Sequence, residues 1–167
     1  MNILLLGYGK MGKIIEEIAL SRGHQIIARI SEENKEERDA LTPAAIDVAI
    51  EFSAPEAAVA NISWALERGI RVVSGTTGWL SEKPRLDALA SAQETAFFYA
   101  SNFSIGVNIF FKVNAFLAKL MQEQSAYQVA IEEIHHTEKK RRPIRHSADP
   151  SRRCIGLTPC LQRVDTC

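Results

Sequence analysis

Short apolar runs alternate with segments of helical periodicity along the first hundred residues. Residues 2–6 form an apolar run of the length typical of a strand buried on both faces. HQIIARIS, IDVAIEFS, RVVSGTTG and TAFFYASNFS predict four further strands with their following loops. Between them, Ile14, Ile15, Ile18 and Ala19 recur at helical spacing, and two more helices are predicted in 55–69 and 83–94. A polar stretch with a turn at Pro43 precedes IDVAIEFS.

This alternation predicts an α/β fold, a Rossmann-type doubly wound parallel sheet with helices on both faces. Ligands of such sheets bind beyond the carboxyl ends of the strands. The turns at Gly7 and Gly75 and the loop around Asn102 all follow predicted strands. We therefore expect these three loops to gather at one edge of the sheet.

The pattern changes after residue 104. Val107, Phe110, Phe111, Leu117 and Leu120 lie near helical spacing, and 127–136 alternates like a half-exposed strand. We expect a dinucleotide-binding domain in 1–104 and the beginning of an α+β substrate and oligomerisation domain in 105–140. The arginine-rich segment 141–167 holds all three cysteines and no aromatic residue, and it is expected to be a poorly packed tail.

Composition narrows the class of protein. The chain has 20 Lys and Arg against 20 Asp and Glu, so its charge indicates neither a nucleic acid nor a membrane surface as partner. No apolar run approaches the length of a membrane span, and the amino terminus does not resemble a signal peptide. The cysteine spacing fits no familiar zinc pattern, so no metal is expected. These features favour a cytoplasmic enzyme.

The residues Gly7-Tyr8-Gly9-Lys10-Met11-Gly12 match G-x-G-x-x-G between a predicted strand and a predicted helix. The first glycine permits the tight turn, the second lets a pyrophosphate approach the backbone, and the third lets helix and strand pack closely. The motif therefore predicts dinucleotide binding. The alternative is a glycine turn kept only for packing.

Two further loops are candidate cofactor contacts. Ser31 stands where an acidic residue would bind the ribose of NAD, and Arg29 could instead meet the 2′-phosphate of NADP, so the choice between NADH and NADPH stays open. Gly75, Thr76 and Thr77 follow a strand and suit close contact with a ligand, although an ordinary strand-end loop would read the same way.

His135 and His136 close the predicted strand 127–136 and point to opposite faces of it. An imidazole titrates near neutral pH and can donate a proton, and Lys139 can supply positive charge beside an anionic substrate. Two surface histidines at a strand end are the alternative interpretation.

Residues 1–140 resemble the 4-hydroxy-tetrahydrodipicolinate reductase (dihydrodipicolinate reductase) family. The resemblance is carried by five motifs, which are in order GYGKMG, DVAIEFSAPE, SGTTG, SNFSIGVN and EIHHTEK. The resemblance implies reduction of a heterocyclic dicarboxylate in lysine and diaminopimelate biosynthesis by a homotetramer. NADH or NADPH would be held by the glycine motif, Gly75–Thr77 and the loop of Ala100, Ser101, Asn102 and Phe103. His135 would be the general acid, Lys139 a second proton donor and His136 a substrate contact.

The sequence departs from the family at Arg141. The family signature continues as DAPSGT, whereas this chain reads RRPIRHS. Codons compatible with residues 141–155, read with the first base deleted, give DAPSGTALTLAEDAL. We therefore expect 141–167 to be an out-of-frame tail and the chain to be a poor catalyst. Alternatives are a nucleotide-binding remnant without catalysis and another Rossmann enzyme, such as one like aspartate dehydrogenase.

Overall fold

The computed structural model describes residues 1–124, 126 and 127 of the chain. The first compact unit is Met1–Phe103, and a second begins at Ser104. The predictions that fall on 128–167, among them His135, His136, Lys139 and the out-of-frame tail, lie outside the described residues.

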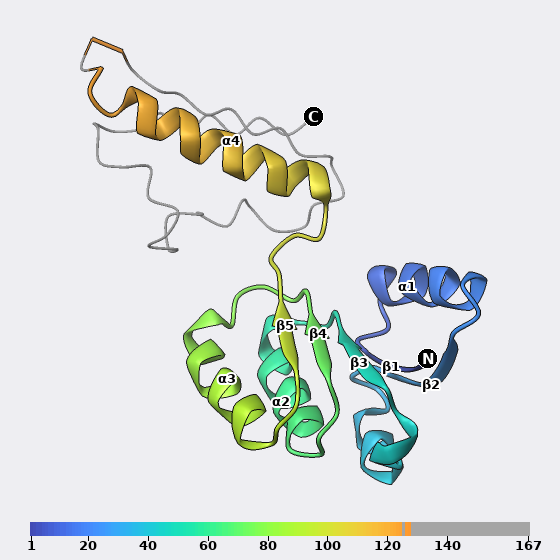
Figure 1. The fold of residues 1–167 in the computed structure, drawn as a ribbon. Coiled ribbons are helices and arrows are strands. Elements are labelled where there is room, and N and C mark those ends of the chain that lie inside the picture. Colours follow the sequence, from blue (N-terminus) through green and yellow to red (C-terminus); the bar gives the residue numbers. More distant parts are fainter. Residues whose placement is uncertain (125, 128–167) are drawn as a thin grey trace. The chain divides into compact units, whose positions relative to one another are not determined.

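The first unit is built on a five-stranded parallel sheet in the order β2-β1-β3-β4-β5 (Figure 1). The strands are β1 Asn2–Leu6, β2 Gln25–Ile30, β3 Val48–Glu51, β4 Val72–Ser74 and β5 Phe97–Tyr99. The chain runs outward from β1 to β2 and then returns to the other side of β1 as β3. The strand order therefore reverses between β1 and β3, and the crevice at their carboxyl ends is where ligands of such sheets bind.

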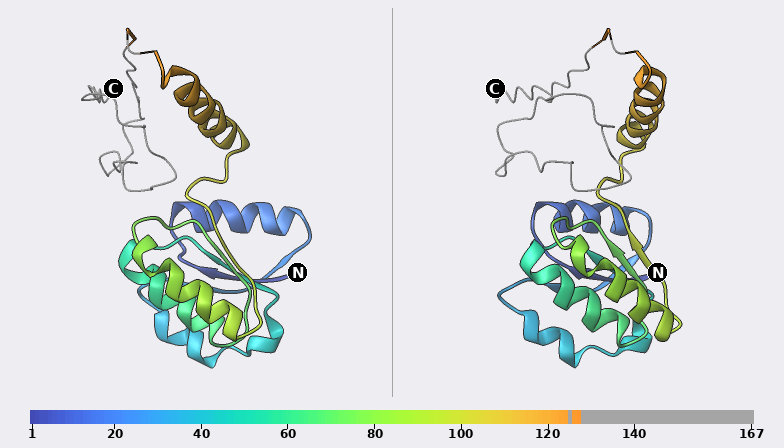
Figure 2. Two further views of the ribbon diagram at one scale, coloured as in Figure 1. Left: turned by 60° about the vertical axis from the view of Figure 1, so that its left-hand side comes forward. Right: turned by 90° about the vertical axis from the view of Figure 1, so that its left-hand side faces the viewer.

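Helices cover both faces of the sheet (Figure 2). The helices are α1 Lys10–Ser21, α2 Pro55–Leu66 and α3 Lys83–Ala92. Along β1, Ile3 and Leu5 pack in the cluster of α1, whereas Leu4 and Leu6 pack in the cluster of α2 and α3. Burying each of these side chains contributes about 1.5–3 kcal/mol, which makes β1 the centre of the core.

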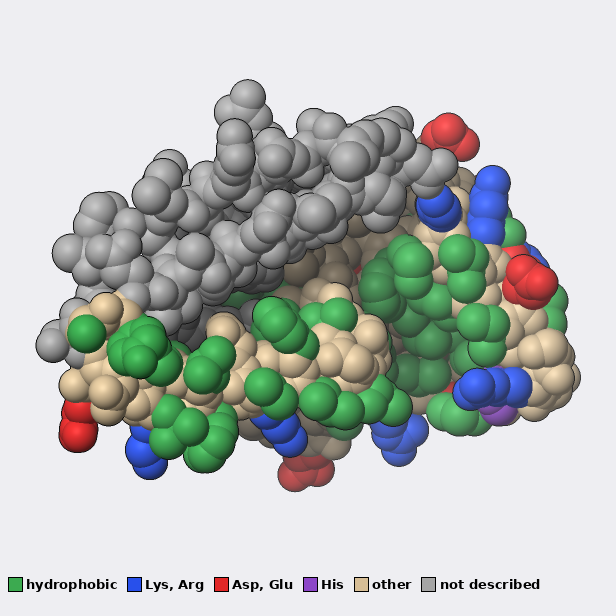
Figure 3. All heavy atoms as spheres, turned by 90° about the horizontal axis from the view of Figure 1, so that it is seen from above, with side chains coloured by type: hydrophobic (Ala, Val, Ile, Leu, Met, Phe, Trp, Pro, Cys, Tyr) green, Lys and Arg blue, Asp and Glu red, His purple; other side chains and the backbone are tan. Residues whose placement is uncertain are grey.

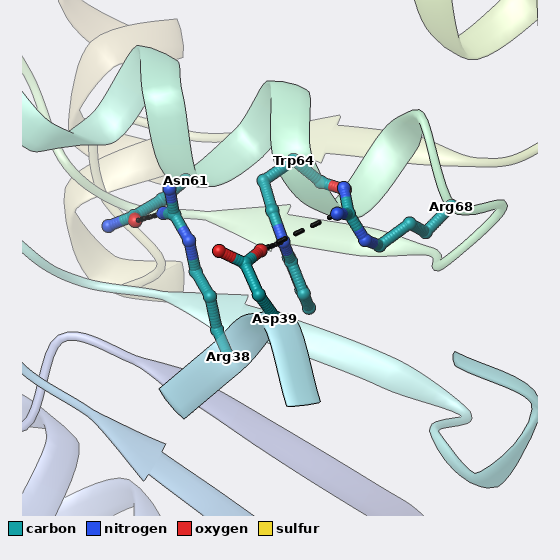
Figure 4. A network of polar contacts seen from close by, with 5 residues as sticks. All are labelled: Arg38, Asp39, Asn61, Trp64 and Arg68. Carbon is teal, nitrogen blue, oxygen red and sulfur yellow. Dashed lines mark hydrogen bonds and ion pairs between the residues drawn. The ribbon is translucent and has the colours of Figure 1, made fainter. Parts of the chain in front are cut away.

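Short 3-10 helices fill the connections: η1 Lys35–Ala40, η2 Pro43–Ala45 and η3 Leu80–Glu82. Figure 4 shows how η1 is fixed to α2. The Trp64 indole Nε1 donates a 2.6 Å hydrogen bond to Asp39 Oδ1, and the guanidinium of Arg68 lies 4.6 Å from the centre of the Trp64 ring. Arg38 Nη1 donates a 2.7 Å hydrogen bond to Asn61 Oδ1. This network anchors the segment that follows β2.

The predicted fold class is confirmed, since the sheet is parallel and covered on both faces. Two local details go beyond what the sequence predicted. The polar stretch around Pro43 contains η1 and η2 rather than a turn alone. On α1, Ile14 and Ile18 are 41% and 47% exposed, because the face that packs on the sheet is formed by Gly12, Ile15 and Ala19.

The second unit contains helix α4, Ile105–Met121. Ser104 caps it, because its side-chain oxygen accepts a hydrogen bond from the Val107 backbone. The predicted apolar periodicity is helical as expected, yet Phe110, Phe116 and Leu120 are each more than half exposed. Apolar side chains line α4 in the space-filling view (Figure 3). Among the described helices, none combines the length and hydropathy needed to cross a membrane.

Candidate dinucleotide-binding site

Gly7 and Gly12 are held in place by backbone packing. Gly7 has φ +100°, and a Cβ there would lie 2.1 Å from the carbonyl oxygen of Phe52. A Cβ on Gly12 would lie 2.4 Å from the carbonyl oxygen of Gly7. Any side chain at either position would therefore displace backbone atoms. These two glycines let β1 turn tightly into α1 and bring the loop against the end of β3.

Gly9 differs from both, because a Cβ built on it meets nothing within 4 Å. It is the N-cap residue of α1, and no side chain in the described part of the chain caps the helix there. The first turn of α1, which includes Lys10 and Met11, contains no acidic residue. The open space beside Gly9 thus lies at the positive end of the helix dipole, an arrangement that suits a phosphate.

The end of β2 lies beside this loop, since the Gly7 amide donates a 2.8 Å hydrogen bond to the Ile30 carbonyl. Ser31 follows directly. Its backbone amide and its hydroxyl lie 2.7 and 3.0 Å from Asn34 Oδ1, to which both donate. The Ser31 side chain is thereby oriented by a local turn, at the position where an acid would bind a ribose.

Tyr8, Glu16 and Arg29 form a cluster next to the glycine motif. The Tyr8 hydroxyl donates to Glu16 Oε2, and Arg29 Nε donates to Glu16 Oε1 at 2.7 Å. The hydrogen bond from Arg29 holds the pKa of Glu16 below its ordinary value, and the hydrogen bond to Glu16 raises the pKa of Tyr8. The guanidinium proposed for a 2′-phosphate is thus engaged by a carboxylate on α1.

The loop after β4 packs on Phe52. A Cβ on Gly75 would lie 2.2 Å from the Phe52 ring, and the Gly75 amide donates to the Glu51 carbonyl at 2.9 Å. Thr76 is buried with 6% of its surface exposed, and its hydroxyl donates to Glu51 Oε1 at 2.8 Å. Thr77 is half-buried. Of the two predicted hydroxyls, only that of Thr77 lies outside the core.

The loop after β5 also contacts Phe52. The Ala100 amide donates to the Ser74 carbonyl at 3.2 Å. Ser101 and Asn102 are exposed, and the ring of Phe103 lies 5.8 Å from that of Phe52, centre to centre. The loops after β1, β4 and β5 therefore all meet at Phe52, as expected for the carboxyl edge of a parallel sheet.

The sequence prediction missed three residues at this meeting point, which are Glu51, Phe52 and Ser53. They lie at the carboxyl end of the predicted strand segment IDVAIEFS, and that position was the available signal. Among the described residues, no group of three or more His, Cys, Asp or Glu is placed to hold a metal ion.

The parallel sheet, the reversal of strand order beside Gly7 and the open backbone at Gly9 define a Rossmann-type dinucleotide-binding domain. The sequence profile described as "Dihydrodipicolinate reductase, N-terminus" matches residues 1–103. The chain belongs to the dihydrodipicolinate reductase family.

Curated relatives of this chain carry the name 4-hydroxy-tetrahydrodipicolinate reductase. The protein of Christiangramia forsetii is 49% identical over 139 residues, which cover 83% of this chain and 57% of the relative. The protein of Archaeoglobus fulgidus is 34% identical over an alignment of 173 positions, which covers 93% of this chain and 62% of the relative. The chain thus spans about six tenths of the length of these relatives.

Among solved structures, aspartate dehydrogenase from Thermotoga maritima superposes with a TM-score of 0.50 at 16% identity, covering 80% of this chain and 56% of that one. This likeness is one of fold. Because the sequence profile assigns residues 1–103 to the reductase family, the aspartate dehydrogenase alternative is set aside.

Proposed function

We propose that this domain binds a reduced nicotinamide dinucleotide across the loops that follow β1, β4 and β5. The observation that carries the proposal is the contrast among the three glycines of the motif. Gly7 and Gly12 are closed by backbone contacts, whereas Gly9 faces open space at the N-terminus of α1. A pyrophosphate would take that space and accept hydrogen bonds from Gly9, Lys10, Met11 and Gly12 amides.

The other predicted cofactor-binding residues would contact the parts of the dinucleotide on either side of the pyrophosphate. The Gly75–Thr77 backbone, the Thr77 hydroxyl and the loop Ala100–Phe103 would line the nicotinamide half. Tyr8 and Ser31 would lie toward the adenosine half, because they adjoin the end of β2.

We propose that NADH and NADPH are both accepted with little discrimination. Ser31 offers no carboxylate to select a ribose 2′-hydroxyl or to repel a 2′-phosphate. Arg29, the cation nearest to that position in sequence, is engaged by Glu16. Neither cofactor therefore meets a dedicated recognition group.

As part of the whole enzyme, the domain would serve the reduction of 4-hydroxy-tetrahydrodipicolinate to tetrahydrodipicolinate in the cytoplasm. A bound nicotinamide supplies the hydride for that reaction. The resemblance assigns His135 as general acid, Lys139 as second proton donor and His136 as a substrate contact. These roles, and the homotetramer, are proposals that rest on family membership.

The test combines binding with turnover. The purified 167-residue chain is titrated with NADH and NADPH and then assayed for oxidation of each cofactor in the presence of substrate. Saturable binding supports the cofactor site. Binding with turnover supports the full reductase assignment, and binding without turnover supports a nucleotide-binding domain alone. A folded chain that binds neither cofactor contradicts the proposal.

A further inference from the structure

Glu51 is the last residue of β3 and is fully buried beside the reversal in strand order. Its carboxyl group is surrounded by neutral donors. Ser74 Oγ donates to Oε2 at 2.6 Å, Thr76 Oγ1 donates to Oε1 at 2.8 Å, and the Ser53 amide donates to Oε1 at 3.0 Å. The Ser53 hydroxyl also donates to Oε1.

These bonds join two loops at the binding edge. Ser53 belongs to the loop after β3, and Thr76 belongs to the loop after β4. A direct bond closes the triangle, because the Ser53 amide also lies 2.8 Å from Thr76 Oγ1 and donates to it. Glu51 therefore fixes the separation of the two loops through one shared oxygen atom.

The same hydrogen bonds orient the backbone of the loop after β4. Glu51 holds the Thr76 side chain inward. The backbone carbonyl of Thr76 accepts a 2.5 Å hydrogen bond from Trp79 Nε1. Its neighbours Gly75 and Thr77 are both partly exposed. With Thr76 anchored, the backbone on either side of it is presented to the edge where the dinucleotide is proposed to bind.

Packing alone does not require a carboxyl group at this position. Removing a carboxyl group from water is costly unless its lone pairs are satisfied, and an apolar side chain of similar volume is often as good for stability. What the carboxyl group adds is directional contact with Ser53 on the loop after β3 and with two donors much later in the chain. These are Ser74 at the end of β4 and Thr76 on the loop that follows it, 23 and 25 residues away.

We propose that Glu51 is a positioning residue for the dinucleotide, acting through Thr76 and Ser53 on the Gly75–Thr77 backbone. The inference rests on the proposed cofactor site. It predicts that the carboxyl group controls cofactor affinity beyond any effect on folding.

The test compares three single variants by cofactor titration, at a temperature where circular dichroism shows each to be folded. Glu51→Leu removes every acceptor, and its Kd for NADPH should rise about tenfold or more, the equivalent of one or more lost hydrogen bonds. In Glu51→Gln the amide oxygen can still accept from Thr76 and Ser53, and the amide N–H can donate to Ser74 Oγ. This conservative variant should stay within about threefold of wild type, a difference below 1 kcal/mol.

Ser74→Ala is the matched structural control, because it removes a bond to the same carboxyl group from within β4. It should lower the thermal midpoint while Kd changes by less than about threefold, again under 1 kcal/mol. If Glu51→Leu does not fold, Thr76→Val takes its place, since it breaks the link from the other side. Thr76→Val should raise Kd about tenfold, as expected for a lost buried hydrogen bond. Where Glu51→Leu does fold, the double variant should bind no more weakly than either single variant, because both substitutions break the same link.

The outcomes separate the two claims. A folded wild-type chain without affinity for either cofactor overturns the proposed function. Wild-type binding together with an unchanged Kd in folded Glu51→Leu, or in Thr76→Val if that variant is used, overturns the positioning role alone.

Discussion

Gly7 lies directly against Phe52, so that a Cβ atom on Gly7 would come within 2.1 Å of the Phe52 carbonyl oxygen. The Phe52 amide in turn donates a 2.9 Å hydrogen bond to the carbonyl of Leu6, the residue before Gly7. The turn that leaves β1 is thereby locked to the end of β3. On the far side of Phe52, its ring contacts Gly75 and Phe103. One residue thus connects three loops of the candidate site.

The glycine motif yields the first prediction. Gly9→Ala should change the free energy of unfolding by less than about 1 kcal/mol, because its Cβ enters open space at a helix N-cap. The same methyl group would occupy the place proposed for the pyrophosphate, so the Kd for NADH should rise at least about tenfold, or 1.4 kcal/mol. Chemical denaturation and cofactor titration measure the two effects.

Gly12→Ala is the control for this substitution. Its Cβ would lie 2.4 Å from the Gly7 carbonyl oxygen, so overpacking should cost about 1–3 kcal/mol of stability. Equal stability losses in the two variants, or unchanged NADH affinity in folded Gly9→Ala, would argue against separate roles for these glycines.

Glu16 yields the second prediction, which concerns cofactor choice. Glu16→Gln leaves Arg29 without its carboxylate partner, so the guanidinium becomes available to a 2′-phosphate. The ratio of NADPH affinity to NADH affinity should rise several-fold, within the roughly 1 kcal/mol expected of a partly exposed ion pair. Glu17→Gln, on the exposed side of the same helix, should leave the ratio unchanged. A ratio that stays constant in Glu16→Gln would show that Arg29 does not reach the phosphate.

The third prediction concerns pH. The hydrogen bond from Arg29 holds the pKa of Glu16 below its ordinary value of 4.5 in the folded chain. A lowered folded pKa means that this contribution to stability is complete above pH 4.5 and is lost as the pH falls through the lowered pKa. Glu16→Gln should therefore show a shallower loss of stability than wild type below pH 4.5 in denaturant melts. Parallel curves for the two proteins in that range would contradict the assignment.

The cluster around Trp64 yields the fourth prediction. Arg68 lies over the indole ring and also pairs with Asp39 at 3.4 Å. Because both contacts are partly exposed, Arg68→Ala should lower the free energy of unfolding by about 0.5–1 kcal/mol. Arg22→Ala, at the exposed end of α1, should stay within about 0.5 kcal/mol of wild type. Similar losses of unfolding free energy in Arg68→Ala and Arg22→Ala would show that the cluster around Trp64 has no specific role in stability.

Local sequence patterns predicted the strands and the glycine turn correctly, because both are determined within about a dozen residues. Leu4 and Leu6 reveal a buried strand, and Gly7 to Gly12 reveal the turn into a helix. The links made by Glu51 could not be predicted in this way, since its partners Ser74 and Thr76 lie on another strand and its loop. Only the folded sheet brings these side chains together.

The same limit explains why two local details could not be predicted. Helical spacing alone could not distinguish the face of Ile14 and Ile18 from the face of Ile15 and Ala19, because small residues let α1 approach the sheet closely on the second face. The 3-10 helix η1 is held by contacts with Trp64 and Asn61, which lie on a helix much later in the chain.

Isothermal titration of NADPH into the folded 167-residue chain tests the central claim most directly. The account predicts saturable binding to one site per chain, with a Kd that rises at least about tenfold in Gly9→Ala. A chain that is folded by circular dichroism and shows no saturable uptake of NADPH or NADH would contradict it.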